Sequence, residues 1–405
     1  MWQNPGRVQP ITFTECVGNY TGIDGRFNLC SRTKQPGSQK CWTGHLPDDE
    51  QAGAAMTYQA FVLKNATELF RRLRSQNSCL AGTMPFTIIF HNWDGVKSFA
   101  EMKPKPVAWQ YQISYQPVLL SWENWQSQIY AGSKLAVVAH VVNDDDYGND
   151  LDEVHLQWWI EKEGEKVLAG EVDLPSVPYY GTCKRPLSID IPQNLVSGDY
   201  MLKGEIWSKG RKVSYNESEL FIAGKDWRDT EVIKKTIYVY DSSAGEQTLN
   251  CLQKFGYPVK AVRMVKELPR NSTLILAKNS WDDSLDNQSG QLKEYVSKGG
   301  RIICLQQDAT TFNQSWLPTS VEFLKDSNND PVYLSPSLAY ADGMNINLER
   351  PYHPVFSGLT PKQFRLWSDY TSYNESKKGF PAIYPVDKGY DLRESGMENV
   401  AAVSY

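Results

Sequence analysis

The chain has 405 residues, of which 41% are hydrophobic, and it carries a formal net charge of -5. A length near 400 predicts two or three domains, because a single domain commonly holds about 150 residues. No apolar run approaches the ~18 residues that cross a bilayer, and no Lys/Arg-rich block is present, so we expect neither a membrane span nor a nucleic-acid partner.

The first segment, residues 1 to about 110, opens on a short predicted strand that ends at a carboxylate. Residues 11–14 are β-branched or aromatic at every position, which favours a strand, and Gly18, Gly22 and Gly25 follow closely. Glu15 therefore stands at the carboxyl end of that strand. In barrel enzymes the loops at this end form the active site, so Glu15 is a candidate catalytic residue.

A helix and a second strand follow. Apolar residues recur at three- and four-residue steps over 49–74, which predicts a helix, and the run GTMPFTIIFHNW at 82–93 predicts a strand. Strand, loop, helix and strand make one βα unit and the start of another. A complete (β/α)8 barrel needs about 200 residues or more, so we interpret this segment as the end of a barrel.

The second strand is predicted to bring Asn92 and Trp93 to the edge at which Glu15 lies, because consecutive barrel strands open on one face. An indole stacks on the apolar face of a pyranose, while a carboxylate attacks or stabilises the anomeric carbon. The arrangement therefore suits a glycoside substrate. In the alternative interpretation, Glu15 is a surface acid and Trp93 is ordinary packing.

From about 113 to 222 the apolar period changes to two, which predicts strands. Alternate residues of the run VHLQWWI, beginning at Val154, are apolar, and six similar runs are separated by Pro, Gly and Asn/Asp turns. About seven strands at this spacing predict an immunoglobulin-like β-sandwich. Trp158 and Trp159 are adjacent and must face opposite ways, so we expect at most one inside the sandwich and the other against a neighbouring domain.

From about Lys234 strands and helices alternate. The apolar runs TIYVYD, VKAVRMV, TLILA and RIICL predict strands, and the stretches at 249–255 and 290–300 predict helices. Uniformly apolar strands with intervening helices predict a parallel sheet covered on both faces, as in a flavodoxin-like domain. The last residues, ENVAAVSY, look like the middle of another strand, so we expect this domain to be truncated.

Seven cysteines are scattered along the chain without a CxxC spacing. This pattern favours neither a disulfide framework nor a zinc site, and we expect no metal and no cofactor. Cys304 lies inside an apolar run, with glycines before the strand and not around the cysteine, so we interpret it as a buried core thiol. A hydrolase of the amidotransferase kind that uses Cys304 is the alternative.

Three other stretches carry polar groups in suggestive order. The run NDDDYGNDLDE from Asn143 places glycine one position too early for a calcium loop, so it predicts a solvated acidic hairpin turn. The run YDSSAGEQ from Tyr240 resembles a loop that holds an anion at a helix N-terminus. The run YNES, at Asn216 and again at Asn374, offers Asn-Glu pairs to which we assign no catalytic role.

The stretches LAGTMPFTIIFHNWDG and MKPKPVAWQYQISYQPVLLSWENWQ resemble the end of the catalytic barrel and the following sandwich of family 2 glycoside hydrolases. That family contains β-galactosidases, β-glucuronidases and β-mannosidases. The last segment, with its stretch from His353 to Trp367, resembles the class I glutamine-amidotransferase-like domain of some large bacterial glycosidases. The resemblance implies a barrel end at 1–111, an immunoglobulin-like sandwich at 112–226 and an amidotransferase-like α/β domain at 227–405.

In this resemblance Glu15 matches the family's nucleophile at the end of the seventh barrel strand. Trp93, with Asn92 beside it, matches the sugar platform at the end of the eighth. The family's acid/base residue follows an Asn at the end of the fourth strand, which this sequence does not contain. We therefore expect the C-terminal portion of a retaining, exo-acting, β-galactosidase-like enzyme that is inactive in isolation. A non-catalytic carbohydrate-binding or assembly module is the alternative.

The resemblance also implies a setting for the protein. The substrate would be an oligosaccharide or another glycoside, the full-length enzyme is a candidate homo-oligomer, and its location would be periplasmic or secreted by analogy alone. The chain does not begin with a basic and then apolar signal segment. Because the organisation fits the end of a larger enzyme, we expect that Met1 is not the natural start.

Overall fold

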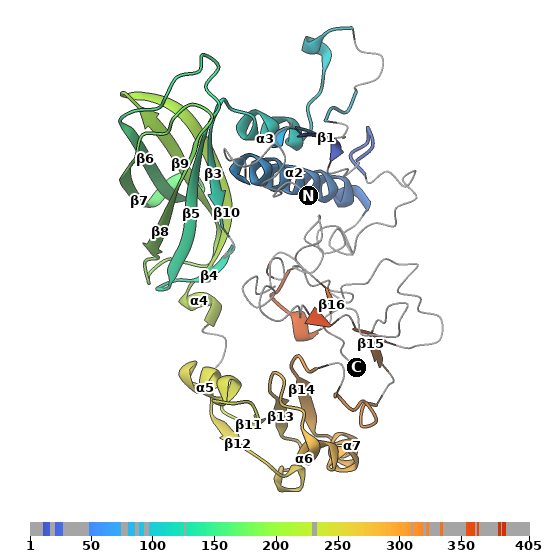
Figure 1. The fold of residues 1–405 in the computed structure, drawn as a ribbon. Coiled ribbons are helices and arrows are strands. Elements are labelled where there is room, and N and C mark those ends of the chain that lie inside the picture. The colour runs from blue at the N-terminus through green and yellow to red at the C-terminus, as the bar shows by residue number, and fades with distance from the viewer. Residues whose placement is uncertain are drawn as a thin grey trace. The chain divides into compact units, whose positions relative to one another are not determined.

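The computed structural model describes residues 11–16, 21–26, 48–73, 80–85, 89–92, 97–124, 127–228, 233–308, 311–318, 321–323, 333–334, 354–360, 363, 380–381 and 383–385. These residues form a mixed α/β structure with several separate sheets (Figure 1). The chain divides into two compact units. The first spans Met1–Lys34, Trp42–Arg228 and Arg350–Leu366, and the second spans Gln35–Cys41, Asp229–Glu349 and Trp367–Tyr405.

The first unit begins with a parallel pair of strands. β1 (Ile11–Cys16) pairs with β2 (Leu80–Pro85), and α2 (Asp48–Leu73) lies between them in the sequence. The predicted strand, helix and strand are present, and residues 86–88 of the predicted second strand lie outside the described residues. Further along, Phe90 forms an antiparallel bridge with Pro104, and the His91 N–H donates to the Lys103 carbonyl (2.9 Å). Of the expected barrel, the described residues contain this two-stranded sheet alone.

Eight strands build a β-sandwich after η1 (Phe99–Glu101) and α3 (Pro106–Ser114). The three-stranded sheet has the order β3-β5-β8, and the five-stranded sheet has the order β4-β10-β9-β6-β7. Their bounds are β3 (Val118–Glu123), β4 (Gln128–Tyr130), β5 (Lys134–Asn143), β6 (Val154–Lys162), β7 (Glu165–Leu174), β8 (Thr182–Asp190), β9 (Gly198–Ser208) and β10 (Arg211–Ala223). All seven predicted strands are found, and the short β4 is additional.

The core of the sandwich lies between the two sheets. Leu120 and Leu135 from one sheet meet Leu156, Leu202 and Ile206 from the other, and all five are fully buried. The alternation of buried and more exposed residues along β9 follows from the two-residue period of a strand. Burial of such side chains stabilises the fold by about 1.5–3 kcal/mol each.

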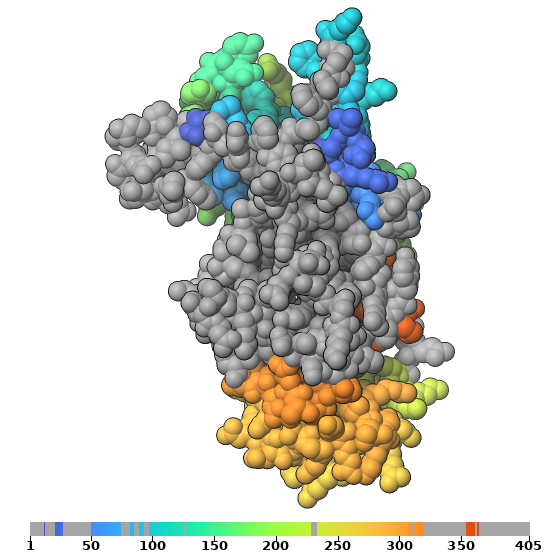
Figure 2. Space-filling view, turned by 90° about the vertical axis from the view of Figure 1, so that its right-hand side faces the viewer, coloured from blue at the N-terminus to red at the C-terminus, as the bar shows by residue number. Residues whose placement is uncertain are grey.

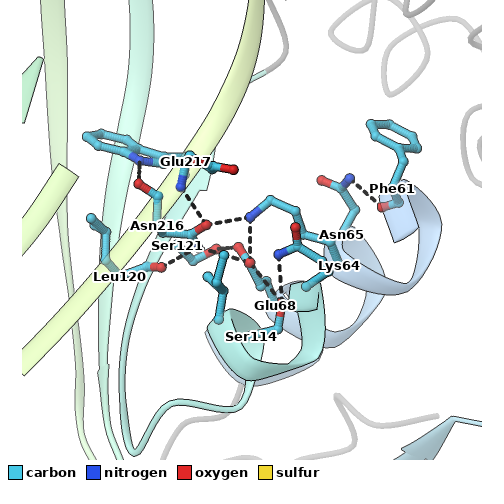
Figure 3. A network of polar contacts seen from close by, with 12 residues as sticks. Phe61, Lys64, Asn65, Glu68, Ser114, Leu120, Ser121, Asn216 and Glu217 are labelled. Carbon is cyan, nitrogen blue, oxygen red and sulfur yellow. Dashed lines mark hydrogen bonds and ion pairs between the residues drawn. The ribbon is translucent and has the colours of Figure 1, made fainter. Parts of the chain in front are cut away.

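A buried polar network joins α2 to the sandwich (Figure 3). The Glu68 carboxylate, which is 3% exposed, accepts hydrogen bonds from Lys64 Nζ (2.7 Å), Ser114 Oγ (3.1 Å), Ser121 Oγ (2.7 Å) and Asn216 Nδ2 (3.0 Å). Lys64 Nζ also donates to Asn216 Oδ1 (2.6 Å). Because each charged group here is met by several partners, α2 is fixed against β3 and β10 by directional bonds as well as by packing.

A second cation on the same helix holds the start of the sandwich. The Arg71 guanidinium donates to the carbonyls of Ser114 (2.6 Å) and Gln116 (2.8 Å) and to Asp144 Oδ2 (2.8 Å). It therefore satisfies carbonyls at the carboxyl end of α3 and reaches the loop after β5. These contacts make the helix and the sandwich parts of one unit.

The second unit contains a four-stranded parallel sheet with the order β12-β11-β13-β14. Its elements are β11 (Ile237–Tyr240), α5 (Gln247–Lys254), β12 (Val259–Ala261), η2 (Val265–Glu267), β13 (Thr273–Leu276), α6 (Asp283–Asp286), α7 (Ser289–Ser297) and β14 (Arg301–Cys304). Leu249 of α5 packs on one face of the sheet, and Leu285 and Leu292 pack on the other. The predicted parallel, doubly covered sheet is confirmed, and Figure 2 shows its described residues as one continuous yellow-to-orange body.

The remaining elements are short. They are α4 (Lys225–Arg228), β15 (Val321–Phe323), β16 (Tyr333–Leu334), η4 (Pro354–Phe356), β17 (Phe380–Pro381) and β18 (Ile383–Pro385). β15 pairs with β18, and β16 pairs with β17. Among the helices of the described residues, none has the length and apolar character needed to span a membrane.

Candidate functional site

Glu15 occupies an irregular position at the carboxyl end of β1. Thr14 is paired with Met84 of β2, and Cys16 is paired with Pro85, so two steps along β1 correspond to one step along β2. Glu15 is the extra residue of this β-bulge. Bulges frequently lie next to active sites, because the extra residue changes the direction in which the strand presents its side chains.

The loop after β1 is anchored by a buried lysine that precedes α3. Lys105 is fully buried, and its Nζ donates to the carbonyls of Thr21 (2.9 Å) and Gly22 (2.7 Å) and to Thr21 Oγ1 (3.0 Å). Thr21 Oγ1 in turn donates to Gln59 Oε1 of α2 (3.0 Å). Burial lowers the pKa of Lys105 to about 8, and nearby Asp24 offsets part of that effect. Three groups of the loop thus depend on one ammonium group.

The residues after β2 meet the same loop. His91 Nδ1 forms a hydrogen bond with the Ile23 carbonyl (2.9 Å), and Lys105 N donates to the Ile89 carbonyl (3.0 Å). Asn92 Nδ2 donates to the Glu101 carbonyl (2.7 Å), and Asn92 Oδ1 accepts from Lys103 N (2.7 Å). The segments that follow β1 and β2 are therefore tied together. Asn92 holds the loop in place through both ends of its amide, and Trp93 lies outside the described residues.

Lys105 is the residue of this region that sequence analysis overlooked. It belongs to the run KPKPVAWQ, which served only as part of a family resemblance, and α3 begins at Pro106. The signal that was available is a lysine held between two prolines, directly before a helix. The two prolines restrict the backbone on either side of Lys105, so its side chain leaves the chain in a fixed direction.

We expect Lys105→Met to lower the free energy of unfolding by about 3 kcal/mol, because it leaves three acceptors, two of them buried, without their donor. The sign of the pH dependence follows from the lowered pKa of Lys105. Between pH 8 and about 10.5 the unfolded chain keeps a proton that the folded chain loses, so this group adds stability as the pH rises. Urea unfolding at pH 7 and pH 10 measures both effects.

The matched control for this substitution is Lys103→Met, two residues away and exposed, which should change stability by less than about 0.5 kcal/mol. Hydrogen exchange of the peptide containing Thr21 and Gly22 should quicken in Lys105→Met and not in the control. Equal stability of the two variants would contradict the anchoring role.

Two features of the second unit differ from the sequence interpretation. Cys304 ends β14 and is exposed, so the predicted core thiol is wrong. Although the residue keeps exposed surface, the protein around the sulfur desolvates the thiolate, and this desolvation raises the pKa of Cys304 to about 12. In YDSSAGEQ, the backbone N–H groups of Thr248 (3.0 Å) and Leu249 (3.3 Å) at the start of α5 donate to Asp241 Oδ2. The helix N-terminus is therefore occupied by a carboxylate of the chain itself.

The acidic run from Asn143 is a connection between sheets and not a hairpin turn, because β5 and β6 belong to different sheets. Asp145 Oδ1 accepts from the backbone N–H groups of Tyr147 (3.0 Å) and Asn149 (3.0 Å). These bonds, with the Asn149 backbone foremost, lower the pKa of Asp145. Asp144 is paired with Arg71. The described residues contain no group of three or more His, Cys, Asp or Glu side chains arranged to hold a metal.

No protein family matches the sequence, and no curated protein matches it. Solved structures resemble parts of the chain. The exo-chitosanase CsxA of Amycolatopsis orientalis is 14% identical over 45% of this chain and 21% of its own, with a TM-score of 0.30. The β-D-mannosidase of Dictyoglomus thermophilum is 14% identical over 47% of this chain and 21% of its own, with a TM-score of 0.29.

The CARDB domain of the PF1109 protein of Pyrococcus furiosus is 10% identical over 26% of this chain and 93% of its own, with a TM-score of 0.20. The chain spans about a fifth of the length of the chitosanase and the mannosidase. The similarity to domains of family 2 glycosidases is therefore weak and partial.

Proposed function

We propose that this chain is the C-terminal portion of a retaining, exo-acting β-glycosidase of the β-galactosidase-like kind, with Glu15 as the nucleophile. The observation that carries the proposal is the place of Glu15, as the extra residue of a bulge at the carboxyl end of β1, in a parallel pair with β2. The loops after both strands are tied together by Lys105 and His91. A reacting carboxylate needs such a fixed surrounding, because small displacements cost large factors in rate.

In this proposal the Glu15 carboxylate attacks the anomeric carbon of a terminal β-linked sugar and forms a covalent glycosyl-enzyme, which water then hydrolyses. Trp93 stacks on the sugar, and Asn92 fixes the loop that carries Trp93 and contributes to substrate binding. Retaining enzymes need a second carboxyl group about 5 Å from the nucleophile as acid and base. The sequence lacks the family's Asn-Glu strand end, so the partner carboxyl comes from the rest of the barrel and this chain alone is inactive.

The proposed domain organisation completes this interpretation. Residues 1–111 would be the end of a (β/α)8 barrel, 112–226 an immunoglobulin-like sandwich and 227–405 an amidotransferase-like, flavodoxin-like domain. The sheet order β12-β11-β13-β14 supports the last assignment, since flavodoxin-like sheets begin with the strand order 2-1-3-4. The raised pKa of Cys304 supports a structural and not a catalytic role for that domain.

The test is covalent labelling of the complete enzyme with a 2-fluoro-glycoside, which forms a glycosyl-enzyme that hydrolyses slowly. Mass spectrometry of the digested protein should find one sugar, on the peptide that contains Glu15. Glu217, the carboxylate of the Asn-Glu pair in the sandwich, should stay unlabelled. A label on any other carboxylate would refute the assignment.

A further inference from the structure

The outward face of the five-stranded sheet combines aromatic and polar side chains in register. Tyr215 of β10 lies beside Glu205 of β9, and Glu205 lies beside Gln157 of β6. In the next row, Lys203 of β9 lies beside Trp159 of β6. Trp207 follows two residues after Glu205 on the same face, because alternate residues of a strand point the same way. We call this set, with Glu161, Lys212 and Glu217, the outer face.

The aromatic rings of the outer face are half-buried and held in place. Trp159 Nε1 donates to Glu161 Oε2 (2.9 Å), and Trp207 Nε1 donates to Glu205 Oε2 (3.2 Å). Each bond joins residues two apart on one strand, so each indole leans along the sheet. Lys166 Nζ stands 4.1 Å from the centroid of the Trp159 ring, so one face of this ring already has a cation over it.

The charges of the outer face are matched with one another. Lys203 Nζ lies 2.6 Å from Glu161 Oε1 and 3.8 Å from Glu217 Oε2, and Lys212 Nζ lies 3.1 Å from Glu205 Oε1. The hydroxyl of Tyr215 donates to Glu217. A face of this kind offers many fixed donors and acceptors but little net charge.

These features narrow the class of ligand. Three carboxylates with two lysines disfavour a phosphate or a polyanion. None of the large hydrophobic side chains described on β6, β7, β9 and β10 is among the exposed ones, so the apolar centre typical of a protein interface is missing there. Hydroxyl groups both donate and accept, and the C–H faces of sugar rings pack on aromatic rings.

We infer that the outer face binds a neutral oligosaccharide, through contact of sugar rings with Trp207, Tyr215 and Trp159 and hydrogen bonds to the paired side chains between them. In Figure 1, β6, β7 and β9 lie on the side of the sandwich away from α2 and α3. The sheet is rigid, so binding needs little ordering of the protein. The inference rests on these contacts and not on the proposed role of Glu15. It locates a second sugar-binding surface, about which the enzyme proposal is silent.

The test is affinity electrophoresis of the full 405-residue chain in native gels that contain galactomannan, xyloglucan or mixed-linkage β-glucan, with polygalacturonate as the anionic comparison. We expect retarded migration with at least one neutral polysaccharide and none with polygalacturonate. The double variant Trp207→Ala/Tyr215→Ala should weaken binding at least about tenfold. Tyr147→Ala, which removes an aromatic ring that is 89% exposed on the loop after β5, should bind as the wild type does.

Glu15→Gln separates this inference from the proposed enzyme. Migration of this variant in the polysaccharide gels should match that of the wild type, whether or not Glu15 has a catalytic role. Circular dichroism and the unfolding midpoint show whether the double variant is folded. If it is not, the single variants Trp207→Ala and Tyr215→Ala, each of which removes one ring, give the same kind of readout with smaller structural cost. Absence of retardation with every neutral polysaccharide, or unchanged retardation in folded variants, would overturn the inference. A changed oligomeric state on loss of Trp207 would assign the face to a protein partner instead.

Discussion

Replacement of Glu68 by alanine is expected to lower the free energy of unfolding of the first unit by about 3–5 kcal/mol. The substitution leaves the Lys64 ammonium group and the Asn216 amide inside the protein without the carboxylate that they meet (Figure 3). Burial of a charge without its partner costs more than the loss of one exposed ion pair. Urea unfolding, followed by the hydrogen exchange of α2, measures the effect.

A matched control for the Glu68 variant lies on the same helix. Glu50→Ala removes an exposed carboxylate near the start of α2 and should change stability by less than about 0.5 kcal/mol. The double variant Lys64→Met/Glu68→Leu removes both charges and should recover part of the loss, since well-packed apolar groups often replace a buried pair without cost. If Glu68→Ala were no less stable than Glu50→Ala, the network would have no role in fixing the helix.

The same carboxylate predicts a dependence of stability on pH. Burial alone would raise the pKa of Glu68, but the charge of Lys64 and hydrogen bonds from Lys64, Asn216 and Ser121 outweigh it and hold the pKa below its usual value. A carboxyl group with a lowered pKa contributes stability above the pKa of the unfolded chain, and that contribution is lost as the pH falls through the folded value. The gap in stability between the wild type and Glu68→Ala should therefore narrow below about pH 4.5.

Elements with a strong local period could be predicted from the sequence. The strands of the sandwich and the parallel sheet of the second unit follow from apolar periods of two and from short apolar runs. The expectation that the adjacent tryptophans face opposite ways is confirmed, since Trp158 packs against the core while Trp159 faces outward. The three-residue β4 was missed because so short a run has no period.

Contacts between distant parts of the chain could not be predicted in this way. Glu68 and Asn216 are 148 positions apart, and each looks like an ordinary polar residue in its own segment. The acidic run after Asn143 was taken for a hairpin turn, because a local pattern does not show which sheet the next strand joins. Lys105 was overlooked for the same reason, since its partners at Thr21 and Gly22 lie more than eighty residues earlier.

The largest expected effect on function belongs to Glu15. In the complete enzyme that we propose, Glu15→Gln should reduce kcat by at least about 10⁴-fold, as removal of a covalent nucleophile does elsewhere. The fold should be retained, because the substitution keeps the size of the side chain and the pairing of β1 with β2 is made by the backbone. Initial rates with an aryl β-glycoside, together with the unfolding midpoint, measure both.

A nucleophile can be distinguished from a residue that merely positions the substrate by chemical rescue. When Glu15→Ala is supplied with azide, the anion enters the space of the lost carboxylate and attacks the anomeric carbon from that side. The product should then be a glycosyl azide of the α configuration, formed by a single inversion, where the wild type retains the β configuration through two. Glu101→Ala, at the exposed turn that Asn92 contacts, should show neither the loss of rate nor the azide product. A β-configured azide, or no rescue with unchanged substrate binding, would assign Glu15 another role and move the search for the nucleophile to a different strand end.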